Sequence, residues 1–247
     1  MNRGYHIQHN AKPSIIREFV EYNPNAKKSE IKEVFSNMKP SIIDDNYTIM
    51  NKLINNEENK NELESLLKMD NVMFNNYLHY KLYSSSSPIG WSYRSVIEIL
   101  WGEYKGKKID YNNIEQKVKD KAFDEGLGSI SFSSKSVRGA INFIKSLYPS
   151  PIDENNIFNL RDYCQPHLLL WGIDYLYKKQ WGDEYGSLML LDDEKIEELC
   201  KFCLIEEDIL DNHLKELDFI YDFIEILIKM FGKYVRLKRE WNFDDIL

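Results

Sequence analysis

SKSVRGAINFIKSL, residues 134–147, separates at helical spacing into an apolar face and a cationic face. The apolar face, which we expect to enter a core, consists of Val137, Ile141, Ile144 and the following Tyr148. The cationic face consists of Lys135, Arg138, Asn142 and Lys145. Gly139 lies inside the same segment, where it costs about 1 kcal/mol relative to Ala in a helix. This glycine therefore predicts a close approach of backbone or of a neighbouring helix.

A helix with this surface fits the major groove of DNA. Arg138 and Asn142 have the donors to reach base edges, and lysines on the same face reach phosphates. The corresponding phosphate contacts would come from Lys135, Lys145 and the backbone at Ser134 or Ser136. Supporting positive charge is expected from two sets of lysines: Lys105, Lys107 and Lys108, and Lys117, Lys119 and Lys121. Acidic neighbours dilute the charge of the second set. The alternative is an ordinary solvated helix face.

The segments around this helix predict a recognisable order of elements. Residues 93–104 and 112–123 have helical periodicity, and residues 152–160 place two short apolar-containing stretches on either side of an Asp-Glu-Asn-Asn turn, as in a hairpin. Helix, helix, helix, hairpin is the order of a winged-helix domain. Residues 91–163 are therefore interpreted as one winged-helix-like module.

The first third of the chain is predicted to be helical and separate. Residues 14–22, 29–35, 42–54 and 61–82 carry apolar side chains at helical spacing, and the last of these is expected to break near Asp70. The stretch SSSSPIG, residues 84–90, disfavours both helix and strand. We interpret residues 1–83 as a helical N-terminal region and residues 84–90 as a linker.

The last third repeats the order of the middle third loosely. Helices are predicted over residues 166–180, after a cap at Asp192, and over residues 206–217. Residues 219–237 fit either a helix or a strand pair that turns at Gly232 and Lys233. The spacing of Phe219, Phe223, Ile226 and Met230 favours a helix over residues 219–231. The whole sequence predicts a mainly α protein with two winged-helix-like modules, 91–163 and 164–247.

The pair of modules resembles tandem winged-helix proteins of bacteria. Such proteins include regulators that bind DNA and acidic subunits of chromosome-organising and plasmid-defence complexes that contact a kleisin. The resemblance covers residues 91–247 and consists in the order of the elements. It implies a non-enzymatic protein, since these families have no catalytic residues to transfer.

Charge distinguishes the two modules. Residues 164–247 carry 10 basic and 19 acidic side chains, whereas the rest of the chain is close to neutral. The segment 206–217 would present Glu207, Asp208 and Asp211, which phosphate repels. We expect the acidic C-terminal third to contact at least one protein partner; its alternative is a plain solvated surface.

Metal and enzyme signals are weak. Cys164 and His167, with Cys200 and Cys203, have the two-residue gaps of a zinc site, but buried thiols in a helix are the favoured interpretation. We expect no cofactor and no enzymatic activity, because the sequence has no phosphate-binding glycine loop and no nucleophile elbow. His6 and His9 are expected to be solvated near the terminus.

These observations lead to three ranked hypotheses. The first is a non-enzymatic DNA-associated adaptor or regulator of a bacterial genome-maintenance or defence complex. It would bind double-stranded DNA weakly and in a salt-sensitive way through residues 134–147, and a partner protein through the acidic C-terminal third. The second is a protein-interaction subunit without DNA contact, and the third is a metal-dependent enzyme. The three cysteines, and the lack of an apolar run of about 18 residues, predict a cytoplasmic protein without a membrane contact.

Overall fold

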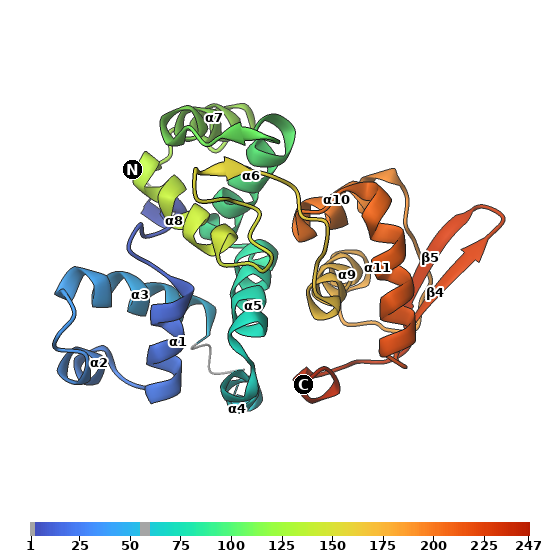
Figure 1. The fold of residues 1–247 in the computed structure, drawn as a ribbon, viewed down its shortest axis with the longest axis horizontal. Coiled ribbons are helices and arrows are strands. Elements are labelled where there is room, and N and C mark those ends of the chain that lie inside the picture. Colours follow the sequence, from blue (N-terminus) through green and yellow to red (C-terminus); the bar gives the residue numbers. More distant parts are fainter. Residues whose placement is uncertain (1–2, 55–59) are drawn as a thin grey trace. The chain divides into compact units, whose positions relative to one another are not determined.

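The chain is mainly α-helical, with small antiparallel hairpins, in a computed structural model that describes residues 3–54 and 60–247 (Figure 1). It divides into two compact units, residues 1–159 and residues 160–247. The high helical content and the small hairpins confirm the predicted mainly α fold class. Within the described residues, no helix has both the length and the hydropathy that crossing a bilayer requires.

In the described residues, unit 1 contains the short 3-10 helix η1, the α-helices α1 to α8 and a small two-stranded sheet. Their bounds are η1 Arg3–Tyr5, α1 Pro13–Tyr22, α2 Lys28–Val34, α3 Pro40–Leu53, α4 Lys60–Lys68, α5 Asn71–Ser84, α6 Pro88–Glu103, β1 Lys107–Lys108, α7 Tyr111–Asp124, α8 Ser134–Lys145 and β2 Ile157–Phe158. The predicted break near Asp70 is confirmed, because the Asp70 carboxylate accepts a hydrogen bond from the Met73 amide and caps α5.

The N-terminal helices are not a separate domain. Residues 84–90 do not form a linker, because Ser84 ends α5, Pro88 begins α6, and only residues 85–87 separate the two helices. Proline at the first position of a helix loses no hydrogen bond, so the Ser-Pro junction starts α6 instead of interrupting it. Helix α5 packs against α1, α6 and α8, which joins residues 13–84 to the predicted first module.

A buried arginine holds the N-terminal helices together. The Arg17 guanidinium in α1 donates to the carbonyl oxygens of Leu66 and Met69, at 2.6 and 2.7 Å, and lies over the Phe74 ring. These carbonyls belong to the C-terminal end of α4, where a cation is favoured by the helix dipole.

The second half of unit 1 has the order α6, β1, α7, α8, hairpin. Lys107 and Lys108 of β1 pair with Phe158 and Ile157 of β2, and Phe158 also forms an antiparallel bridge with Ile152. Phe158, which follows the hairpin turn, therefore lies between β1 and Ile152, which precedes the turn.

Unit 2 has the same order of elements. It contains α9 Pro166–Trp181, β3 Met189–Leu190, α10 Asp193–Cys203, α11 Glu207–Ile220, β4 Ile224–Lys229, β5 Gly232–Leu237 and η3 Phe243–Asp245. The strand order is β3-β5-β4, so the strand after the hairpin turn is again central. The predicted cap at Asp192 is confirmed by its hydrogen bond from the Lys195 amide at 3.0 Å.

The helix predicted for residues 219–231 is wrong. Helix α11 ends at Ile220, and residues 224–237 form the β4–β5 hairpin, which turns at Met230 and Phe231. The β-branched residues Ile224, Ile226 and Ile228 alternate along β4, and this period of two prevails over the helical spacing.

The N-terminal segment, residues 5–12, crosses α8 at Gly139 and is fixed at several points. A Cβ atom on Gly139 would lie 2.6 Å from the Ile7 carbonyl oxygen and 2.9 Å from that of Gln8. The Ser92 hydroxyl donates to Tyr5, and buried Asn46 bonds Asn10 and Lys12. The close approach predicted from Gly139 is confirmed.

Gly139→Ala is expected to destabilise unit 1 by about 1–3 kcal/mol, since the methyl group meets backbone that cannot move aside without loss of other contacts. Gly102→Ala is the matched control in α6, because nothing lies within 4 Å of the added Cβ. That change should be neutral or stabilise by up to about 1 kcal/mol. Urea unfolding followed by circular dichroism measures both, and a Gly139→Ala variant as stable as the wild type would contradict this packing.

Candidate nucleic-acid interface

Helix α8 presents a narrow cationic strip to solvent. Val137, Ile141 and Ile144 are buried as predicted, while the side chains of Lys135, Arg138 and Lys145 are exposed on the opposite side. Tyr148 is wrongly predicted as core: the helix ends at Lys145, so Tyr148 leaves the helical register and is 65% exposed. The three exposed cations, here called the α8 strip, are Lys135, Arg138 and Lys145.

Asn142 does not face a ligand. Its side-chain amide donates to the carbonyl oxygens of His9 and Ala11, each at 3.0 Å, in the N-terminal segment. Both amide N–H donors are therefore used within unit 1, and a bidentate contact to adenine would need one of them. The predicted base contact of Asn142 is replaced by a structural one.

The serines of α8 also have internal partners. Ser136 is buried and its hydroxyl bonds Nδ1 of His6, so the expectation of a solvated His6 is wrong. Burial is the main cause of the lowered His6 pKa. The Ser134 amide donates to the Glu115 carboxylate at 2.6 Å. A phosphate at the start of α8 would therefore meet a carboxylate already bound there.

The lysines of α7 are paired with carboxylates. Lys117 lies 2.8 Å from Glu103, Lys119 lies 2.5 Å from Glu115, and Lys121 contacts Glu98. The dilution expected from acidic neighbours takes the form of direct ion pairs. These lysines contribute little net positive potential to unit 1.

The three lysines around β1 lie on a different element from the α8 strip. Lys107 and Lys108 are exposed residues of the small sheet, and the Lys105 ammonium lies 4.1 Å from the centre of the Trp101 ring. Arg138 has a similar aromatic support, since its guanidinium carbon lies 5.2 Å from the centre of the Tyr111 ring in α7.

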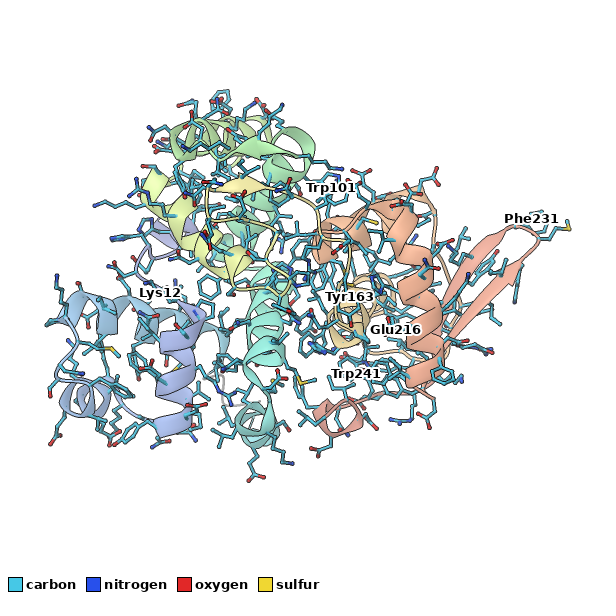
Figure 2. The ribbon with its side chains drawn as sticks, viewed as in Figure 1. Lys12, Trp101, Tyr163, Glu216, Phe231 and Trp241 are labelled. Atoms are coloured by element: carbon cyan, nitrogen blue, oxygen red, sulfur yellow. The ribbon has the colours of Figure 1, made fainter. Side chains whose placement is uncertain are left out.

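A second cationic feature, which the sequence analysis missed, joins the end of the α8 strip. A shallow cavity of about 230 Å³ is lined by Lys12, Pro13, Ser14, Asn75, Asn142, Lys145 and Ser146. Lys12 precedes α1 and is labelled in Figure 2, and Lys145 ends α8. Two lysines that are 133 positions apart in the sequence thus line one cavity, together with the exposed Ser14 in the first turn of α1. The Lys145 ammonium lies 3.5 Å from the Asp153 carbonyl oxygen.

Unit 2 presents an acidic surface at the helix that corresponds to α8. Glu207, Asp208, Asp211 and Asp218 are exposed on α11, and the sequence between Glu207 and Ile220 holds one basic residue, Lys215. The segment predicted to be repelled by phosphate is indeed a helix.

The zinc candidates do not assemble. Within residues 3–54 and 60–247, no three His, Cys, Asp or Glu side chains are placed to share a metal ion. Cys164, Cys200 and Cys203 are buried thiols and none of the three is in a disulfide, and the His167 ring packs edge-on against Trp171.

Comparisons with known proteins found no family model that matches the chain, no similar curated protein and no similar solved structure.

Asn142→Ala is expected to destabilise unit 1 by about 1–3 kcal/mol, because two carbonyl oxygens lose their donors. Arg138→Ala, in which an exposed side chain of the same helix is truncated, should change stability by less than about 1 kcal/mol. Urea unfolding compares the two. Equal stability of Asn142→Ala and wild type would mean that the amide is not held by the N-terminal segment.

Proposed function

We propose that the chain is a non-enzymatic, DNA-associated adaptor in which unit 1 holds the phosphate backbone of duplex DNA and the acidic unit 2 contacts a partner protein. Residues 88–159 and 160–247 would each be a winged-helix-like module. Support comes from their shared order of helices and strands and from the central position of the strand after the hairpin turn in both small sheets. The adaptor would act in the cytoplasm of a bacterium.

The observation that carries the proposal is the convergence of the α8 strip and the Lys12–Lys145 cavity. Lys135 and Lys145 are ten residues apart, which corresponds to about 15 Å along a helix. The major groove is about 12 Å wide, so the two ends of α8 have the spacing to contact phosphates on both sides. Lys12 adds a further cation at the Lys145 end.

The same geometry favours backbone contact over sequence readout. Asn142 is used internally, and Arg138 remains as the one base-reading candidate of the original pair. Lysine ammonium groups bind phosphates as point charges and carry no sequence information. Weak binding with strong salt dependence is therefore expected.

A protein-interaction subunit without DNA contact is the second candidate. It is favoured by the acidic surface of α11 and by exposed apolar side chains at the β4–β5 hairpin, where Phe231 is 78% exposed. A metal-dependent enzyme stays the third hypothesis, and among the described residues no three His, Cys, Asp or Glu side chains are placed to share a metal ion.

Neutralisation of the α8 strip tests the first candidate. With four phosphate contacts, the slope of log affinity against log salt should be about −3.6, and Lys135→Gln with Arg138→Gln and Lys145→Gln should make it shallower by about 2.7. Fluorescence anisotropy of a labelled duplex measures the slope. The single change Lys12→Gln should make it shallower by about 0.9 if the cavity takes a phosphate.

The matched control removes the same net charge from unit 2, through Lys179→Gln, Lys215→Gln and Lys238→Gln, whose side chains are exposed. Its binding should resemble that of the wild type. The absence of duplex binding at about 50 mM salt, where such electrostatic contacts are strong, would rule out the first candidate. An equal loss of duplex affinity in both triple variants would show that only the net charge of the chain determines binding.

A further inference from the structure

The β4–β5 hairpin ends in large apolar side chains that unit 2 does not cover. Ile228, Met230 and Phe231 are 75, 87 and 78% exposed, and we call them the hairpin tip. Figure 2 shows Phe231 at the free end of the hairpin. Phe219, near the end of α11, is 92% exposed. Clusters of exposed apolar side chains are typical of interaction sites.

The hairpin lies beside the acidic face of α11. Lys233 of β5 forms an ion pair with Asp211, and the Ile226 amide of β4 donates to the Asp218 carboxylate at 3.0 Å. Ile224, Ile226 and Ile228 lie on the same face of β4. Ile224 is buried in the core, and Ile228 is exposed at the other end of the strand. Apolar side chains of the hairpin and carboxylates of α11 thus border one continuous surface.

The charges of this surface define the chemistry of its occupant. Glu207, Asp208, Asp211 and Asp218 make the α11 side of it acidic, and Lys233 pairs directly with one of them, Asp211. Lys229, between Ile228 and Met230, adds one positive charge at the hairpin, where its ammonium lies 5.6 Å from the centre of the Tyr234 ring. Both duplex DNA and an anionic lipid surface would be repelled. A partner that offers basic side chains together with apolar ones matches both features.

Strand addition and self-association fit less well than a helix. The outward-facing amide of Ile226, in the middle of the edge strand β4, donates to the Asp218 carboxylate. This hydrogen bond interrupts the row of backbone donors that an added strand requires. A second copy of the chain has a cationic helix in α8, but the apolar residues Val137, Ile141 and Ile144 of that helix are buried.

We propose that α11 and the hairpin tip form a docking surface for a cationic amphipathic helix of a partner protein. Basic residues of that helix face Asp208, Asp211 and Glu207, and its apolar stripe contacts Phe231, Met230 and Ile228. The inference rests on the protein-contact half of the adaptor function and is independent of DNA contact by the α8 strip.

Site-specific photo-crosslinking in the source cells tests the surface. The full chain carries p-benzoylphenylalanine at Phe231, or at Phe123 of α7 as the control, since Phe123 is 74% exposed on unit 1. We expect an adduct at position 231, and not at 123, whose crosslinked peptide has basic and apolar residues at helical spacing. No adduct at 231, an adduct to a second copy of this chain or to lipid, or an acidic crosslinked peptide would overturn the proposal.

The crosslinked segment is then synthesised and its affinity for the full chain measured. Met230→Ser with Phe231→Ser, and separately Glu207→Gln with Asp208→Asn, should each weaken binding at least about tenfold, which corresponds to about 1.4 kcal/mol. Phe123→Ser is the matched control and should leave the affinity unchanged. Unchanged affinity in both double variants would overturn the proposal. Duplex binding should persist in these variants, so a failure of the DNA function and a failure of this surface are distinguishable.

Discussion

The contact between residues 5–12 and α8 determines which polar side chains of unit 1 face solvent. Gly139 admits the backbone of Ile7 and Gln8, and Asn142 then satisfies the carbonyl oxygens of His9 and Ala11. Within this segment the Ala11 amide donates to the Gln8 carbonyl oxygen at 3.0 Å, whereas the carbonyl oxygens of His9 and Ala11 take their donor from α8. Because this contact uses the amide of Asn142, the exposed strip of α8 retains cations alone.

The second half of unit 1 and unit 2 have the same order of elements but opposite surface charge at corresponding helices. Helix α8 presents Lys135, Arg138 and Lys145, whereas α11 presents Glu207, Asp208 and Asp211. A fold does not determine function, and the difference lies in side chains that the core does not constrain. The adaptor proposal assigns each surface a partner of the opposite charge.

Local signals in the sequence predicted much of the fold. Asp192 caps a helix as expected, and Asp70 caps α5 at the break that was predicted near it, because a cap depends on residues three positions away. The error at residues 219–231 arose because the apolar spacing there fits two periods, and the alternating isoleucines of β4 were the stronger indication. The internal use of Asn142, and the position of Lys12 beside Lys145, depend on residues more than 130 positions apart, which no local pattern encodes.

The central claim is that α8 offers phosphate contacts with little base readout, and the affinities for two duplexes of equal length and unrelated sequence test it most directly. A bidentate base contact discriminates between bases by about 1–3 kcal/mol, whereas phosphate contacts do not discriminate. We expect dissociation constants within about threefold of each other at one salt concentration. A preference of about a hundredfold for one sequence would contradict it.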